Sequence, residues 1–153
     1  MNTLVVYYSR TGHNEQMAQQ LHAALPGDLD QIVDMKKREG MFGCVMSAML
    51  RMKTRIQFGK DPAAYDQVVV VTPFWAGALP PATRTYLTEN RGKLQDYAVL
   101  SVCGMGEENK QARVDVAATA KREPRAMLLL KEAEVAAEAS QRQYQAFVEQ
   151  LPH

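Results

Sequence analysis

Short apolar runs alternate with segments of helical periodicity along this chain. The runs lie at residues 4–8, 29–33, 68–72, 97–102 and 126–130. Most of them are continuous rather than alternating, which is typical of strands buried on both faces of a parallel sheet. The helical patterns lie between and after them, at residues 14–25, 80–90, 107–122 and 140–151. Five strands that alternate with helices predict a doubly wound α/β sandwich.

Length and charge limit the kind of protein further. At 153 residues the chain predicts a single domain, 1–153, with a substantial core. The net charge is +1 and no large block of like charge is present, so nucleic acid is not an expected partner. The short basic stretch Lys36-Lys37-Arg38 is interpreted as a solvated loop.

The distribution of apolar and metal-binding residues excludes other classes. No apolar run approaches the length of a membrane span, and the first residues lack a signal-peptide pattern. The two cysteines, Cys44 and Cys103, are too few and too far apart for a disulfide framework. No Cys/His spacing is typical of metal ligands, so no metal is expected. These observations favour a cytoplasmic protein with reduced thiols.

A methionine-rich segment, 41–58, does not fit a simple alternation of strands and helices. Apolar residues at positions 41, 45, 48, 52 and 56 share one helical face. We expect a helix that covers one face of the sheet, because apolar helical stripes usually belong to the core. An alternative is that the wide apolar surface also forms the wall of a ligand pocket or a homodimer contact, since methionine adapts to varied shapes.

The loop after the first apolar run carries the clearest functional signal. It consists of Ser9-Arg10-Thr11-Gly12-His13-Asn14. The N–H groups of such a turn and of the helix that follows it point at one spot, where the helix dipole favours an anion. Three side chains could add donors and the glycine lets the backbone come close. The loop therefore predicts a phosphate site, with an ordinary capped helix as the alternative.

The spacing of residues in this loop excludes several classes of phosphate-binding protein. A P-loop ATPase would need a lysine after Gly12, and a dinucleotide-binding turn would need more glycines. A low-molecular-weight tyrosine phosphatase would carry its nucleophilic cysteine here, whereas both cysteines lie elsewhere.

Two further loops follow later strands at the same predicted edge of the sheet, where open parallel sheets bind ligands. The second loop is Pro73-Phe74-Trp75-Ala76-Gly77. Its tryptophan, the only one in the chain, is poorly placed for core packing and well placed to stack on a planar ligand. The third loop is Cys103-Gly104-Met105-Gly106, whose glycines let backbone N–H groups face a ligand. Cys103 could be a redox thiol or a small buried apolar residue.

Together the three loops predict a phosphate cradle, an aromatic wall and a glycine-rich backbone edge, which FMN fits. Residues 8–14, 72–77 with 79–87, and 101–106 resemble, in this order, the flavin loops of flavodoxin-like proteins. The resemblance implies a three-layer sandwich around a five-stranded parallel sheet of order 2-1-3-4-5, with helices on both faces.

The resemblance also implies roles for the loop residues. The side chains that would bind the FMN phosphate are those of Ser9, Thr11 and Asn14. The backbone N–H groups that would complete the cradle are those of Arg10, Gly12 and His13. The residues around the isoalloxazine would be Pro73, Phe74, Trp75, Ala76 and Gly77. The pyrimidine edge would meet Cys103, Gly104, Met105 and Gly106.

The chain departs from electron-carrying flavodoxins in its charge. These carriers are similar to one another in being strongly acidic, whereas this chain has a sequence pI of about 7.8. Residues 73–81 contain no acid, and Glu107 and Glu108 only follow the third loop. This favours an FMN-dependent oxidoreductase that moves electrons or hydride between a donor such as NAD(P)H and a planar acceptor such as a quinone. An electron carrier for a protein partner and a flavin-free structural or regulatory module are the alternatives. No acid–base pair is evident, so no catalytic residue is assigned.

Overall fold

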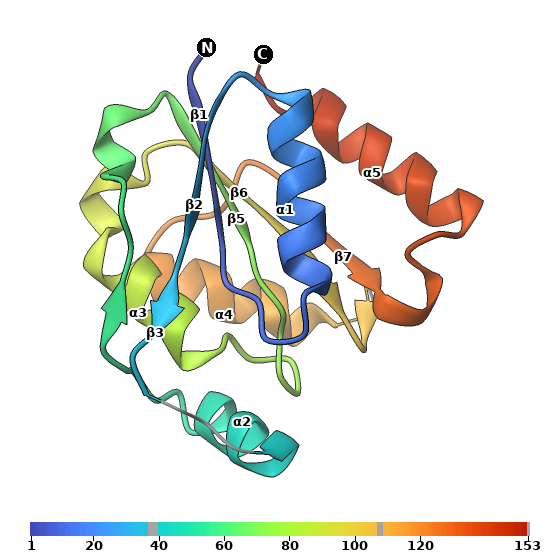
Figure 1. Cartoon of the computed structure of the whole chain (residues 1–153). Coiled ribbons are helices and arrows are strands. Elements are labelled where there is room, and N and C mark those ends of the chain that lie inside the picture. Colours follow the sequence, from blue (N-terminus) through green and yellow to red (C-terminus); the bar gives the residue numbers. More distant parts are fainter. Residues whose placement is uncertain (37–39, 107–108, 153) are drawn as a thin grey trace.

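The computed structural model describes residues 1–36, 40–106 and 109–152. Within them a parallel sheet is built from five strands: β1 (Thr3–Tyr7), β2 (Gly27–Gln31), β5 (Gln67–Val71), β6 (Tyr97–Cys103) and β7 (Met127–Lys131). The strands lie in the order β2-β1-β5-β6-β7 (Figure 1). The predicted order 2-1-3-4-5 is therefore confirmed.

Helices cover both faces of the sheet. One face carries α1 (His13–Ala24) and α5 (Glu138–Gln150), and the other carries α3 (Pro81–Glu89) and α4 (Lys110–Ala120) (Figure 1). Each face has its own apolar cluster, formed by strand residues and the inward side chains of its two helices. This arrangement confirms the predicted three layers. Short 3₁₀ helices lie at η1 (Pro62–Ala64), η2 (Arg91–Lys93) and η4 (Glu132–Glu134).

The strands follow the apolar runs closely, with one shift. Every residue of β1, β5 and β6 is buried, as continuous runs predict for central parallel strands. The run at 29–33 predicts a strand two residues later than β2. The cause is that β2 is an edge strand, where Asp28 and Asp30 can face solvent and do not interrupt pairing with β1.

The helix bounds agree with the patterns to within one or two residues for α1, α3 and α5. α3 begins with Pro81, which suits the first helical position because proline lacks an N–H group there. α4 ends earlier than the pattern at 107–122 because Lys121 adopts a left-handed φ of 59°. The predicted start of this helix at Glu107 lies outside the described residues.

The prediction of one helix over 41–58 is wrong. α2 (Gly40–Met49) stops early, and Arg51 takes a left-handed φ of 53°. The N–H of Met52 donates to the Ser47 carbonyl (3.0 Å), and the N–H of Arg51 donates to the Ala48 carbonyl (3.0 Å). This is the hydrogen-bond pattern of a Schellman C-cap, with arginine where glycine is usual. The apolar residues at 52 and 56 therefore leave the helical face.

α2 does not cover a face of the sheet either. The face nearest to it is already covered by α3 and α4. In the chain α2 lies between the two strands of a short antiparallel pair, β3 (Val33–Asp34) and β4 (Ile56–Gln57), and in space it lies beyond the carboxyl ends of the sheet strands (Figure 1). Among its described side chains, only those of the small residues Cys44 and Ala48 are fully buried members of the apolar core. None of the described helices has the length and apolar character that crossing a membrane requires.

Candidate functional site

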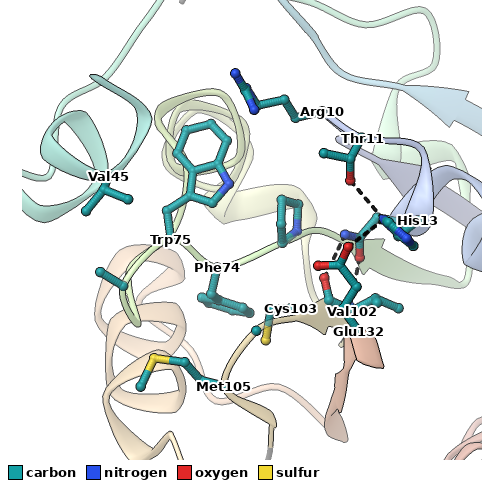
Figure 2. Close-up of a pocket in the computed structure, with 14 residues that line it drawn as sticks. Arg10, Thr11, His13, Val45, Phe74, Trp75, Val102, Cys103, Met105 and Glu132 are labelled. Carbon is teal, nitrogen blue, oxygen red and sulfur yellow. Dashed lines mark hydrogen bonds and ion pairs between the residues drawn. The ribbon is translucent and has the colours of Figure 1, made fainter. Parts of the chain in front are cut away.

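A cavity of about 260 Å³ opens at the carboxyl edge of the sheet, where the three predicted loops meet (Figure 2). The predicted site residues that line it are Arg10, Thr11, His13, Asn14, Pro73, Phe74, Trp75, Ala76, Cys103, Gly104 and Met105. Val45 of α2, Val102 of β6 and Glu132 also line it. Val45 belongs to the apolar face that was the alternative candidate for a pocket wall, whereas the sequence did not point to Glu132. Segments distant in the chain thus form one concave surface.

The loop after β1 presents the start of α1 to this cavity. Gly12 is the N-cap residue with a left-handed φ of 96°, a conformation that favours glycine. No side chain of the described residues caps the first turn of α1. The N–H groups of that turn therefore keep their capacity to donate to an anion, which the helix dipole also favours.

A hydrogen bond within the loop engages Ser9. Its Oγ accepts from the Gly12 N–H (3.0 Å), which holds the loop in shape. Ser9 lines a neighbouring hollow between the loop, β3 and α2, and neither Ser9 nor Gly12 is among the described residues that line the cavity. The Ser9 hydroxyl keeps its own hydrogen, so its bond to a phosphate stays a prediction.

A polar chain runs along one side of the cavity (Figure 2). The Thr11 Oγ1 lies 2.9 Å from the His13 Nδ1, which lies 3.1 Å from a carboxylate oxygen of Glu132. Glu132 directly follows β7, so the rule that ligands bind beyond strand ends could have found it. Among the described lining residues it is the one carboxylate.

Asn14 is buried and joins α1 to β6. Its Nδ2 donates to the Val102 carbonyl (2.9 Å), and its Oδ1 accepts from the Val102 N–H (2.9 Å). This pair of bonds uses the acceptor and one of the two amide hydrogens. One amide hydrogen is left for a ligand, so the side chain mainly fixes the distance between the first and third loops.

The second loop forms a tight hairpin. The Trp75 N–H donates to the Ala78 carbonyl (2.9 Å), and the Ala78 N–H donates back (3.1 Å). Between them Ala76 and Gly77 have positive φ angles of 52° and 77°, as in a type I′ turn. A Cβ atom at Gly77 would lie 2.7 Å from the Asn109 side chain. The close approach that requires glycine is therefore to Asn109, and Gly77 does not line the cavity.

The aromatic residues of this loop are buried, which corrects the expectation that Trp75 is unsuited to the core. Trp75 is 7% exposed and belongs to the apolar cluster under α3 and α4. Its ring meets the ring of Tyr8 edge-on, with centroids 6.0 Å apart and planes at 66°. Phe74 is buried beside it. The wall that these two residues give the cavity is thus already packed from behind.

The third loop supplies a buried thiol and an exposed thioether. Cys103 is buried, and Cys44 and Cys103 are both free cysteines. Met105 is exposed, and its sulfur accepts a hydrogen bond from the Asn109 amide (3.3 Å). Gly106 is buried with a φ of 65° and lies outside the cavity lining. The part of the third loop that lines the cavity therefore consists of Cys103, Gly104 and Met105.

A buried ionic network anchors the chain behind the second loop. Asp115 accepts from both terminal nitrogens of Arg84 (2.9 and 2.7 Å) and from the Leu79 N–H (2.8 Å). Arg51, just after α2, pairs with the same carboxylate. Burial on its own would raise the pKa of Asp115, but the bonds from Arg84 and Leu79, helped by the charge of Arg51, lower that pKa below its usual value.

The chemistry of the cavity is that of binding rather than of proton transfer. It combines an anion-binding helix start, an aromatic and apolar wall and a backbone edge. No pair of carboxylates lines it among the described residues. The Thr11 hydroxyl and the Glu132 carboxylate both approach the same ring nitrogen of His13, so the imidazole does not relay a proton between them through its two nitrogens. Across the residues that the structure describes, no cluster of His, Cys, Asp or Glu could hold a metal ion.

No protein-family model and no curated protein matches this chain. Solved structures do match it over most of its length. A flavoprotein from Lactobacillus acidophilus, solved in complex with FMN, is 18% identical with a TM-score of 0.73, over 88% of this chain and 95% of that one. Oxidised flavodoxin 2 from Bacillus cereus is 16% identical with a TM-score of 0.61, over 98% and 97% of the two chains. The flavodoxin of Streptococcus pneumoniae TIGR4 is 16% identical with a TM-score of 0.59, over 99% and 97%. The chain therefore has the flavodoxin-like fold.

Proposed function

We propose that this chain is a flavoprotein that binds FMN in the cavity at the carboxyl edge. The observation that carries the proposal is that an uncapped helix start and a buried aromatic wall border the same cavity. A ligand with one phosphate joined to a flat ring system matches both. The Lactobacillus acidophilus neighbour with the same fold is in complex with FMN.

The residues of the cavity fit this cofactor one by one. The phosphate would accept hydrogen bonds from the backbone N–H groups of Arg10 and His13, from the Thr11 hydroxyl and from the remaining amide hydrogen of Asn14. The Gly12 N–H is already bonded to Ser9. The ring system would lie against Phe74 and Trp75, and its polar edge would meet the backbone at Gly104. These contacts satisfy the free donors and cover the apolar wall.

FMN, when bound, supplies transfer of electrons or of a hydride. The chain's own residues hold it, keep water from the side of the ring that faces the aromatic wall, and set the local charge. Arg10 and His13 place basic groups near the cavity, and Glu132 places one carboxylate there. This balance differs from the excess of acid expected around the flavin of an electron-carrying flavodoxin.

We propose an oxidoreductase that passes electrons from a donor such as NAD(P)H to a planar acceptor such as a quinone. Support comes from the exposed side chain of Met105 beside the aromatic wall of the cavity, which suits a flat uncharged molecule. A cytoplasmic location, where both free thiols stay reduced, belongs to the same proposal.

The first test is the absorbance spectrum of the purified protein, in which flavin bands are expected. Adding FMN to flavin-free protein should also quench the fluorescence of Trp75, the only tryptophan of the chain. A colourless protein whose fluorescence does not respond to FMN would contradict the proposal. Oxidation of NADPH by a quinone without an added reductase separates an oxidoreductase from an electron carrier, which would need its protein partner.

The local charge leads to a second measurement. Because few acidic groups surround the cavity, the reduced cofactor should meet less repulsion than in an acidic flavodoxin. A redox titration should therefore give a milder reduction potential than those carriers have. A potential as low as theirs would show that charge near the flavin does not set the value in this protein.

A further inference from the structure

α2 places its side chains in the opposite way to an ordinary surface helix. Its small residues Cys44, Ser47 and Ala48 are buried, whereas its large apolar residues face solvent. The exposed fractions are 78% for Phe42, 37% for Met46, 57% for Met49 and 64% for Leu50, which follows the helix. These four residues are here called the α2 patch. Contiguous exposed apolar groups of this kind mark a contact surface.

Basic residues flank the α2 patch on both sides. The helix itself carries no charge in its first or last turn. Lys36 precedes it, and Lys53 and Arg55 follow it, all of them exposed, whereas the exposed Arg51 is paired with Asp115. Residues 34–60 contain seven basic residues and two acidic ones, although the whole chain has a net charge of only +1. The contact surface is therefore both apolar and cationic.

We infer that the α2 patch docks on an anionic lipid surface. A helix with large apolar side chains on one face and with Lys and Arg beside them lies in the interface of a bilayer, where the apolar groups enter the acyl boundary. The basic flanks would meet the negatively charged headgroups. α2 is short and stands at one end of the molecule, so it can lie on the membrane without spanning it (Figure 1).

Charge argues for this occupant over a second copy of the chain. A two-fold dimer through the α2 patch would bring the same surface of both copies together. The basic flanks of both copies would then surround one apolar contact, and residues 34–60 of each copy bring seven basic residues and only two acidic ones to it. An anionic bilayer offers both an apolar phase and opposite charge, which this surface needs at the same time.

Docking would bring the candidate cofactor cavity to the membrane. Val45 lies on α2 and lines the cavity, while the α2 patch occupies other positions of the same helix (Figure 2). An acceptor dissolved in the bilayer, such as a lipid-soluble quinone, would therefore reach the cavity without crossing bulk water. This last step rests on the proposed function, whereas docking itself does not require a cofactor.

The test is sedimentation of the full-length protein with sucrose-loaded vesicles. Vesicles of phosphatidylcholine with about one third phosphatidylglycerol should bind the protein, whereas pure phosphatidylcholine vesicles should bind it at least tenfold more weakly. Binding should weaken as salt rises, because the headgroup charge is screened. Equal binding to both kinds of vesicle, or none to either, would overturn the inference. The result does not depend on FMN, so it separates docking from the proposed function.

Matched variants assign the binding to the α2 patch. Phe42→Ser should lower vesicle binding about tenfold, while Val114→Ser, at an apolar site on α4 that is 61% exposed and lies outside the α2 patch, should leave it unchanged. Arg55→Glu should weaken binding to anionic vesicles more than Arg142→Glu, the same charge change on α5. These sites are exposed, so the variants should fold, which thermal unfolding verifies. Equal losses in the control variants would overturn the assignment.

Two additional readouts address the alternatives. Light scattering after size exclusion should show that the oligomeric state is the same in wild type and Phe42→Ser. A dimer that this substitution dissociates, in a protein that ignores vesicles, would show that a second copy covers the α2 patch. If the proposed activity is present, Phe42→Ser should keep turnover with a water-soluble quinone and lose it with a vesicle-embedded one.

Discussion

α1 and α2 border the same cavity but use their apolar residues in opposite directions. α1 buries Met17 and Leu21 against the sheet and turns its glutamines to solvent, whereas α2 buries small residues and exposes Phe42 and Leu50. The sheet thus fixes the first helix, and the anion-binding end of the cavity with it. The second helix exposes its large apolar side chains to solvent. The sheet therefore holds one wall of the cavity in place, whereas the helix that carries the other wall exposes the α2 patch on its outer side.

The largest effect is expected at Asp115, which connects the end of α2 to the rest of the fold. Asp115 pairs with buried Arg84 and with Arg51 at the end of α2, so Asp115→Asn should leave a buried guanidinium without its partner. We expect a loss of about 3–5 kcal/mol in the free energy of unfolding, measured with urea. Asp96→Asn is the matched control, because it breaks the more exposed pair with Arg125 and should cost about 1 kcal/mol or less. Equal losses would mean that burial does not decide the strength of these pairs.

The same carboxylate predicts how acid affects stability. The pKa of Asp115 is lower in the folded protein than in the unfolded chain, where a value of about 3.9 is usual. Its contribution is therefore fully present above about pH 4 and is lost as the pH falls through the folded pKa. Unfolding measured between pH 7 and pH 3 should show a smaller decline for Asp115→Asn than for the wild type. An identical decline would assign the acid sensitivity to other carboxylates.

The contrast between the helices can be tested directly with one kind of substitution. Leu21→Ala in α1 should lower the free energy of unfolding by about 2–5 kcal/mol, because Leu21 is fully buried. Leu50→Ala beside α2 should change it by about 0.5 kcal/mol or less, because that side chain is mostly in solvent. Chemical denaturation of both variants provides the measurement. A large loss at Leu50 would show that the α2 patch is covered within the chain.

The smallest expected effect concerns the ligand. Trp75→Ala should weaken FMN binding by about 1 kcal/mol, roughly fivefold, through lost stacking. Phe42→Ala, which removes an aromatic ring from α2 outside the cavity lining, should not change the affinity. Because Trp75 also packs on Tyr8, unfolding of the flavin-free variants should be compared as well. Unchanged FMN affinity and unchanged potential in Trp75→Ala would show that Trp75 is not the flavin wall.

The sheet was predictable because its strands are continuous apolar runs, and their burial on both faces leaves few alternatives. The end of α2 was not predictable, since the helical period continues to residue 56 while the backbone turns at Arg51. Nothing local marks that turn, because arginine stands where glycine usually ends a helix. The helix ends where it does because of a distant partner, Asp115, and of the β3–β4 pair.

The meeting of the three site loops was predictable for a topological reason, since parallel strands bring their carboxyl ends to one edge. The use of individual side chains was not. Ser9 bonds to Gly12 inside its own loop, Gly77 faces Asn109, and Asn14 bonds to Val102. Which partner each side chain bonds to depends on differences of a few tenths of an ångström in atomic position. A pattern of residue types does not contain that information.

The contact between His13 and Glu132 fixes a direction in the hydrogen-bond chain beside the cavity. A carboxylate only accepts, so the approach of Glu132 to the Nδ1 of His13 favours the form of the ring that carries a hydrogen atom on this nitrogen. The Thr11 hydroxyl, 2.9 Å from that nitrogen, meets a donor and keeps its own hydrogen for another acceptor. A carboxylate after the last strand of the chain thus turns the hydroxyl of the first loop into a donor for an anion. With Glu132→Gln the tautomer would be free to reverse, and Thr11 would then donate to the imidazole instead.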